Sequence, residues 1–371
     1  MFDNAEDPGD LRPYWPSTEA GGRVLVTSRN PHWQPLATPV PVDVLPRPEA
    51  IAFLHRRVGI DKDHADQLAA ALGDLPLALE QAAAYLEQTH TPAGEYLGLL
   101  AIRARELFAL PRPATSEQTI ATIWTVSLDR VRAVSPVAQE LLTLCGFLAP
   151  DDLPRALLLE HADALPEQLA AAVRDRLAFH QAIAALRRYS LVTTTGDALR
   201  LHRLVQAVTR NALDVGDQHQ WTTVAVRLVA AGFPDNADDA DAWPVATRLL
   251  AHAIVVTNHP ALDLTDPQAT VSLLHRVTDY LWGRGDYSQA KPLAEQALAI
   301  CEARLGADPP TTESLNNLAV VLHDQGDLDR ARTLHERALA IREARLGPDH
   351  PDTMRSRERL AAVLAKLENR Q

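Results

Sequence analysis

Cysteine and lysine, on which disulfide frameworks and phosphate-binding loops depend, are scarce in this chain. Its 371 residues include two cysteines, Cys145 and Cys301, which are too few for a disulfide framework and fit a reducing compartment. No run of 18 apolar residues occurs, and the first residues do not form a signal peptide, so we expect a cytoplasmic protein without a membrane segment. The sequence also contains neither a metal-spaced set of cysteines and histidines nor a nucleophile motif.

Lysine is equally scarce, and its placement excludes one motif. Among the 36 lysines and arginines only Lys62, Lys291 and Lys366 are lysines, and none of them follows a glycine. The phosphate-binding loop G-x-x-x-x-G-K-[ST] is therefore not present in this sequence. The net charge of −12 argues against a broad surface for nucleic acid or an acidic membrane. The 46% hydrophobic content is typical of a core-forming protein, and the length predicts two or three domains.

A ten-residue segment near the end of the sequence occurs twice, almost unchanged. Ala297–Gly306 reads ALAICEARLG and Ala338–Gly347 reads ALAIREARLG, with an offset of 41 residues. A Gly-Asp pair precedes each copy, at Gly285 and at Gly326. Apolar residues recur at helical spacing on both sides of the second pair, so each unit is predicted to be a helical hairpin.

Three motifs lie within and beside these repeats. They are SLNNLA at Ser314–Ala319, QGD at Gln325–Asp327 and LGPDHPDT at Leu346–Thr353. These motifs resemble the tetratricopeptide repeats of the kinesin-light-chain subtype over about residues 270–368. Two hairpins are few for a solenoid, so we expect helices near 217–231 and 243–256 to support them.

The resemblance implies that the first helix of each hairpin lines a groove for a partner protein or peptide. Asparagine suits an extended peptide, because its side chain can both donate to and accept from a peptide backbone. The alternative is that the polar residues of these helices only solvate a short stack. The exposed positions expected to contact the partner are His275, Arg276, Asn316, Asn317, His323, Arg357 and Glu358.

Three other short segments follow one another near the start of the chain. They are FDN at Phe2–Asn4, VLVTSR at Val24–Arg29 and GDLPLA at Gly73–Ala78. In this order they resemble the nucleotide-binding module of STAND ATPases of the NB-ARC type, although Asp74 is one residue more than the GLPLA pattern has. The resemblance implies that Asp3 holds Mg²⁺, that Arg29 meets the γ-phosphate and that Pro76 lies against the adenine.

The phosphate-binding loop of that family is the part that this sequence lacks. The strand and helix that carry the loop would lie before Met1, so we expect the chain to be the back half of such a protein: a fragment, a chain with a misplaced start, or a degenerate relative. ADP or ATP with Mg²⁺ is expected as a cofactor only if the loop is supplied, and independent ATP hydrolysis is not expected. The resemblance also allows a nucleotide-dependent oligomer.

A helix-rich stretch followed by a β-hairpin is predicted in the middle of the chain. Asp151–Pro154 is predicted to begin one of these helices, and two short β-branched segments flank Gly196. This order resembles the winged helix that follows the nucleotide core in STAND proteins. At its end Leu201-His202-Arg203 resembles the M-H-D motif, whose histidine bonds the β-phosphate of ADP, which implies His202 as a cofactor contact. Arg203 replaces the aspartate of that motif, so the resemblance does not extend to the aspartate's contact.

The predicted fold class is mainly α. It combines a remnant of an α/β P-loop NTPase core, a helical domain, a winged helix and an α-solenoid of tetratricopeptide repeats. The predicted boundaries are 1–60 for the C-terminal part of the NB-ARC core, 61–112 for the ARC1-like helical domain, 113–215 for the ARC2-like winged helix, 216–269 for a helical linker or degenerate repeats, and 270–371 for the repeats.

Three functions compete at this point. The first is a STAND-type signalling or regulatory switch, in which nucleotide controls the packing of the winged helix and the repeats hold a partner. The second is a tetratricopeptide adaptor for protein–protein interaction, which binds no ADP even after the missing loop is supplied. The third is a DNA-binding regulator that uses the winged helix. The net charge argues against binding of nucleic acid, whereas salt-dependent binding of duplex DNA would support this third function.

Overall fold

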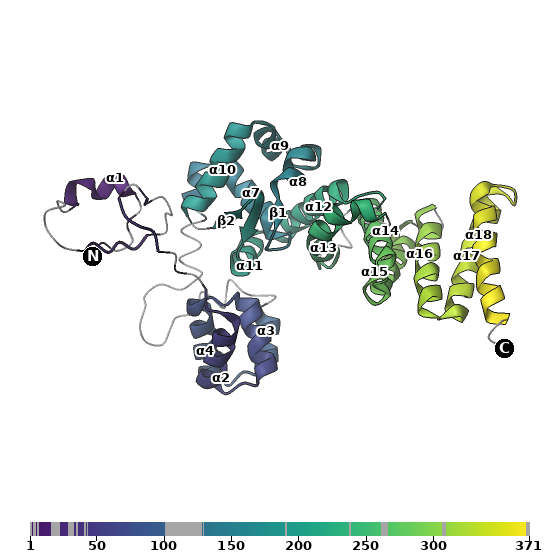
Figure 1. Ribbon diagram of the computed structural model, residues 1–371, viewed down its shortest axis with the longest axis horizontal. Helices are drawn as coiled ribbons and strands as arrows, with labels where there is room; N and C mark the ends of the chain where they lie inside the picture. The colour runs from purple at the N-terminus through teal and green to yellow at the C-terminus, as the bar shows by residue number, and fades with distance from the viewer. Residues whose placement is uncertain are drawn as a thin grey trace. The chain divides into compact units, whose positions relative to one another are not determined.

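The chain is mainly α-helical, and its last part is a solenoid of helical hairpins (Figure 1). The computed structural model describes residues 2, 5, 7–15, 23–28, 33–34, 36–40, 42, 44–100, 128, 130–189, 191–236, 239–260, 266–305 and 309–368. Within these ranges no helix is both long enough and apolar enough to cross a membrane. The chain divides into two compact units, residues 1–162 with 166–215 and residues 163–165 with 216–371, and each is described by itself.

Two extended segments pair in parallel at the start of the first unit. Phe2 forms a bridge with Val26: its N–H donates to the carbonyl of Leu25 at 2.9 Å, and its carbonyl accepts from Thr27 at 2.9 Å. The ring of Phe2 also stacks on Trp15, with ring centroids 6.3 Å apart. Short helices lie between the two segments: α1 (Pro8–Leu11) and η1 (Arg12–Tyr14). A parallel pair needs such a crossover connection, because a tight hairpin would make the strands antiparallel.

A small helical bundle follows, formed by α2 (Arg47–Val58), α3 (Lys62–Leu72) and α4 (Pro76–Thr89). Leucines and alanines from all three helices share one core. The side chain of Asp61 caps α3 by accepting from the N–H of His64 at 3.0 Å. Helix α2 packs against both α3 and α4, so the helices of the bundle begin at Arg47.

The rest of the first unit combines helices with a small antiparallel sheet. The strand order is β1-β3-β2, with Leu199 of β3 paired to Leu153 on one side and to Thr194 on the other. The predicted β-hairpin is confirmed, with Gly196 at φ 60° in its turn. The elements are α7 (Pro136–Gly146), β1 (Leu153–Pro154), α8 (Arg155–Glu160), η3 (Ala162–Ala164), α9 (Glu167–Arg174), α10 (Arg176–Arg188), β2 (Val192–Thr195), β3 (Ala198–Leu201) and α11 (Arg203–Asn211).

One prediction in this region is wrong. Asp151–Pro154 was expected to begin a helix, but Leu153 and Pro154 form a strand that pairs with β3, and helix α8 begins only at Arg155. Both strand residues are buried. Tertiary pairing with the hairpin therefore outweighs the local preference of acidic residues for a helix start.

The second unit consists of helices that pack against their neighbours in the sequence. Consecutive helices from α14 to α18 are in contact, and α14 also contacts α16. A buried core of leucines and alanines runs from α15 to α17 and continues to Val363 on α18. The elements are α12 (Val215–Gly232), η4 (Ala240–Ala242), α13 (Trp243–Thr257), α14 (Pro267–Gly283), α15 (Tyr287–Ile300), the π-helical turn η6 (Cys301–Leu305), α16 (Pro309–Gln325), α17 (Leu328–Leu346) and α18 (Pro351–Glu368).

Glycine turns connect the two helices of each hairpin. Gly285 between α14 and α15 has φ 78°, and Gly326 between α16 and α17 has φ 86°. Only glycine adopts this left-handed conformation without strain, so the repeated Gly-Asp pairs mark the turns. The side chain of Asp327 then accepts from the N–H of Arg330 and begins α17. The glycine therefore forms the turn in both hairpins, whereas the aspartate side chain caps only α17, since Asp286 makes no side-chain cap at α15.

Candidate functional site

The segment Gly73–Pro76 forms a tight turn between α3 and α4. Gly73 ends α3 with φ 61°, and Asp74 follows with φ 57°, so two successive residues are left-handed. The N–H groups of Gly73 and Asp74 donate to the carbonyls of Ala70 and Ala69, which satisfies the end of α3. Glycine adopts this conformation freely, whereas an aspartate must be held in it by its surroundings.

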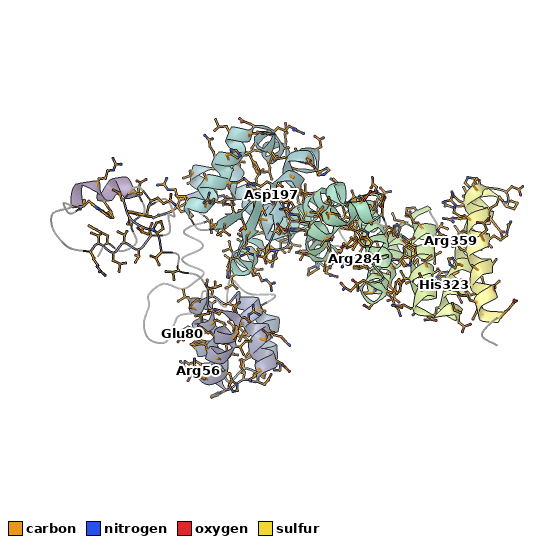
Figure 2. All side chains as sticks on the ribbon, viewed as in Figure 1. Arg56, Glu80, Asp197, Arg284, His323 and Arg359 are labelled. Carbon is orange, nitrogen blue, oxygen red and sulfur yellow. The ribbon has the colours of Figure 1, made fainter. Side chains whose placement is uncertain are left out.

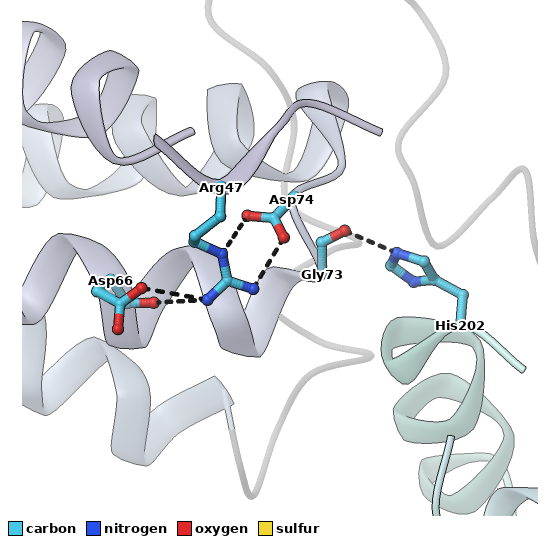
Figure 3. A network of polar contacts seen from close by, with 5 residues as sticks. All are labelled: Arg47, Asp66, Gly73, Asp74 and His202. Atoms are coloured by element: carbon cyan, nitrogen blue, oxygen red, sulfur yellow. Dashed lines mark hydrogen bonds and ion pairs between the residues drawn. The ribbon is translucent and has the colours of Figure 1, made fainter. Parts of the chain in front are cut away.

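Arg47, the first residue of α2, holds this turn (Figure 3). Its Nε and Nη2 donate to the two carboxylate oxygens of Asp74 at 2.7 and 2.8 Å, and its Nη1 lies 3.2 Å from the Asp66 carboxylate. The main chain adds a further connection, since the N–H of Leu45 donates to the carbonyl of Asp74 at 3.0 Å. The Asp74 side chain is only 14% exposed, so solvent screens this pair less than it screens an ordinary surface ion pair.

His202 contacts the same turn from the start of α11 (Figure 3). Its Nδ1 accepts from the N–H of Leu204 at 3.2 Å, and its Nε2 lies 3.1 Å from the carbonyl oxygen of Gly73. A carbonyl can only accept, so Nε2 carries the proton and the imidazole is the neutral Nε2–H tautomer. A single side chain therefore caps α11 and binds a residue 129 positions earlier in the sequence.

The surroundings of His202 favour this neutral form. Burial lowers the pKa of His202 and is the largest effect, and the hydrogen bond to the Gly73 carbonyl opposes it. Among the nearby charges, Arg203 lowers the pKa further, while Asp74 and Asp151 raise it. The balance keeps the pKa below its ordinary value, so the cap of α11 is present at neutral pH.

Gly73 has no room for a side chain. A Cβ atom built on it would lie 2.5 Å from both Cε1 and Nε2 of His202, far inside van der Waals contact. The glycine is thus required twice, once by its positive φ and once by the close approach of the imidazole. The first residue of the GDLPLA segment and the histidine of Leu201-His202-Arg203 fit each other directly.

The helix that His202 begins is also fixed at the end of α7. Gln206 donates through Nε2 to the carbonyls of Cys145 and Leu148 at 2.8 and 2.9 Å, and Arg210 donates through Nη1 to the carbonyl of Gly146. These carbonyls lie at the C-terminus of α7, where intrahelical partners run out. Leu204 and Val208 of α11 pack in the core of the α2–α4 bundle. Helix α11 therefore connects the bundle to α7.

Four residues were predicted to contact nucleotide or Mg²⁺. Pro76 is the first residue of α4 and is exposed, three positions after Gly73, so it lies close along the chain to the carbonyl that His202 binds. Asp3 and Arg29 lie outside the described residues, and their roles with Mg²⁺ and the γ-phosphate stay predictions. The described residues contain no group of three acidic, histidine or cysteine side chains that could hold a metal ion.

Two of the expected partner contacts in the repeats are not exposed, contrary to the prediction. His275 is 4% exposed, and its Nε2 lies 2.6 Å from Oγ of Ser314 on the neighbouring repeat. Asn316 is 1% exposed, donates to the carbonyl of Thr312 at 2.9 Å, and accepts at 3.1 Å from Nδ1 of His335. Both side chains satisfy buried polar groups between helices, so their polarity serves packing rather than the surface.

The other expected partner contacts keep some exposure. Arg276 is half-buried and donates to the carbonyl of Phe233 at 2.7 Å, while Arg357 pairs with Glu343 at 2.7 Å and Glu358 is exposed. Asn317 and His323 are half-buried on α16. The Asn317 Nδ2 and the His323 Nε2 are themselves buried atoms, and neither has a hydrogen-bond partner in the described part of the chain. His323 lies on α16 and Arg359 on α18, and both are labelled in the repeat region in Figure 2.

Sequence reasoning missed Arg47 and treated Asp74 only as an inserted residue. The two side chains meet across 27 positions, and nothing local in the sequence connects them. One signal was present: an aspartate directly after a helix-ending glycine is among the residues that tolerate a left-handed conformation. The Arg47–Asp74 pair and the Gly73–His202 contact together define the network shown in Figure 3.

Comparison with known proteins relates both units to described families. Residues 270–311 and 311–352 match the tetratricopeptide repeat, and the prediction of these repeats is confirmed. Residues 130–218, which contain the small sheet and α11, match a domain of unknown function, DUF7779.

The chain is also similar to a nucleotide-binding leucine-rich repeat (NLR)-like protein of Hyaloscypha variabilis. The two are 28% identical over an alignment of 328 residues, and the match covers 81% of this chain and 31% of that protein. The chain therefore spans about a third of the length of this relative.

Proposed function

We propose that the chain is part of a STAND-type regulatory switch of the NB-ARC class, in which the α3–α4 turn and His202 belong to the nucleotide site. The observation that carries the proposal is the contact between Gly73 and His202, because it joins the two motif remnants that the resemblance assigns to one nucleotide. The NLR-like relative supports the same class. The strand order β1-β3-β2 and the hairpin before α11 support a winged helix that ends at the Leu201-His202-Arg203 motif.

The chemistry of these residues fits an adenine nucleotide. His202 presents an N–H donor at Nε2, the atom type that binds a phosphate oxygen. Pro76 offers an exposed apolar ring at the start of α4, where it leaves no N–H group without a partner. In this proposal Pro76 lies against the adenine, His202 binds the β-phosphate, Arg29 meets the γ-phosphate and Asp3 holds Mg²⁺. The bound nucleotide would supply the charge that distinguishes the resting state from the active state.

Nucleotide loading needs a phosphate-binding loop in addition to these residues. The sequence contains no Gly-Lys pair, so residues 1–371 alone lack the lysine and the backbone amides that stabilise charge in phosphoryl transfer. We therefore assign ATP hydrolysis to no residue of this chain. The proposal is for a binding and switching role.

The repeats supply the partner-binding part of the switch in this proposal. Asn317 and His323 stay candidate contacts on α16, where both residues are half-buried, and an asparagine amide suits the backbone of an extended peptide. Arg276, Arg357 and Glu358 remain candidate contacts at the surface. His275 and Asn316 are left out, because their hydrogen bonds are made inside the solenoid.

The test is ADP binding by a fusion protein that carries a G-x-x-x-x-G-K-[ST] segment in frame before Met1. Isothermal titration should show ADP binding, and His202→Ala should weaken it about tenfold or more, the loss expected for a hydrogen bond to a charged oxygen. His180→Ala is the matched control, since His180 is exposed on α10 and takes no part in the network. Equal affinity in the His202 and His180 variants would refute the role of His202.

An adaptor without nucleotide binding is the second candidate. It is favoured by the fact that the Gly73 carbonyl already satisfies His202 without any ligand. It predicts no heat of ADP binding by the fusion protein, with the repeats still folded. The titration therefore separates the two candidates.

A further inference from the structure

The inserted aspartate of the GDLPLA segment has a task that the family pattern does not assign. Asp74 is left-handed although it is not a glycine, and its carboxylate is largely shielded from solvent. Such a conformation costs about 1 kcal/mol for a residue with a side chain, so contacts must favour it. The two-point pairing with Arg47 and the hydrogen bond from the N–H of Leu45 supply those contacts.

The backbone conformation of Gly73 and Asp74 determines where the carbonyl of Gly73 points. That carbonyl belongs to the planar peptide unit between residues 73 and 74, so its direction is set by ψ of Gly73 and φ of Asp74 together. If Asp74 moved to the negative φ that most residues prefer, the peptide plane would rotate. The carbonyl would then turn away from the His202 Nε2, from which it now accepts a hydrogen bond at 3.1 Å.

We propose that Asp74 and Arg47 are positioning residues. They hold the Gly73 carbonyl where it accepts the hydrogen bond of His202 when no nucleotide is bound. The pair fixes the turn, the turn aims the carbonyl, and the carbonyl fixes the tautomer of the imidazole. The N–H of Leu45 ties the segment that precedes α2 to the same turn, so a shift in that segment changes the acceptor of His202. The inference deepens the proposed nucleotide site and rests on it for its biological meaning.

The alternative is an ordinary ion pair that only stabilises the bundle. An ion pair of that kind would leave the tautomer of His202 unchanged when it is broken, because losing the Asp74 charge only lowers the pKa of His202 further and keeps the imidazole neutral. The state of His202 therefore distinguishes positioning from simple stabilisation. This readout needs no nucleotide, so the inference and the proposed function can fail separately.

The experiment uses the full chain labelled with ¹⁵N in histidine, and observes the ring nitrogens by long-range ¹H–¹⁵N correlation. The signals of His202 are identified by their loss in His202→Gln. In the wild type, Nδ1 should be an unprotonated acceptor and Nε2 protonated. Asp74→Ala should give mixed tautomers, and the Leu204 amide should exchange about fivefold faster, the factor that corresponds to losing one hydrogen bond of about 1 kcal/mol.

Two further variants complete the test. Asp74→Asn should fall between the wild type and Asp74→Ala, because asparagine tolerates the left-handed conformation but accepts only one of the two hydrogen bonds from Arg47. Asp66→Ala is the control, since Asp66 contacts Arg47 but not the turn, and it should leave His202 unchanged. If Asp74→Ala does not fold, Arg47→Met decides in the same way. A folded Asp74→Ala or Arg47→Met protein with the wild-type tautomer and the wild-type Leu204 exchange rate would overturn the proposal.

Discussion

Replacing Gly73 by alanine should break the contact between the α3–α4 turn and α11. The added Cβ would lie 2.5 Å from two ring atoms of His202, so the imidazole must move. Alanine at φ 61° costs about 1 kcal/mol, the lost hydrogen bond to the carbonyl about 1 kcal/mol and the lost cap of α11 about 1 kcal/mol. Gly73→Ala should therefore destabilise this region by about 3 kcal/mol.

A double-mutant cycle separates the clash from the backbone strain. His202→Ala alone should cost about 2 kcal/mol, for the hydrogen bond and the cap. In the double variant there is no imidazole to clash, so the total should be about 3 kcal/mol instead of the roughly 5 expected for independent sites. Gly59→Ala is the matched control, because Gly59 ends α2 with φ 74° but has no atom within 4 Å of an added Cβ. It should show only the strain of about 1 kcal/mol.

Hydrogen exchange measured by mass spectrometry is the suitable assay for this cycle. The full chain contains two units, so one global melting curve does not report the site alone. Peptides from α3, α4 and α11 give the free energy of local opening where the substitutions act. If the effects of Gly73→Ala and His202→Ala add, the close contact inferred here is wrong.

Buried polar groups elsewhere lead to three more expectations. Burial lowers the pKa of His335 from 6.5 to about 4. As the pH falls, His335 is therefore protonated in the unfolded chain before it is protonated in the folded chain. The repeats should lose stability between about pH 6.5 and about pH 4 in thermal melts, and an equal pH dependence in His335→Gln would contradict this. Asn316→Ala should destabilise the repeats by about 2 kcal/mol in melts, because it leaves the His335 Nδ1 unpaired, whereas Asn317→Ala should change stability by less than about 0.5 kcal/mol. Arg210→Met removes the donor to the Gly146 carbonyl and should speed amide exchange in α7 by about fivefold, while unchanged exchange would make that contact irrelevant.

Helix bounds in the repeats could be read from the sequence because their signals are local. Gly326 and Asp327 mark the turn and the start of α17, and Gly347 marks its end, so the predicted helix 328–346 has the observed bounds. The mainly α fold class and the tetratricopeptide repeats are confirmed. The burial of Asn316 could not be read in the same way, because it depends on the partner His335 on another helix.

The candidate site was only partly predictable for the same reason. Pro76 and His202 were selected by their motifs, and the structure brings the segments that carry them into contact through Gly73. The pairing of Arg47 with Asp74 has no counterpart in local sequence, since it joins the start of one helix to the turn between two others. Likewise, Leu153 and Pro154 became a strand through pairing with β3, which outweighed the signals of a helix start.

The most direct test of the account is to locate a bound adenine on the protein. A photoreactive azido-adenine ADP, applied to the fusion protein with the phosphate-binding loop, should label the peptide that contains Pro76 and the start of α4. Unlabelled ADP should compete, and His202→Ala should reduce the labelling at subsaturating nucleotide. Label that falls outside the α3–α4 turn and the start of α11, or no competable label at all, would contradict the assignment of this turn to a nucleotide site.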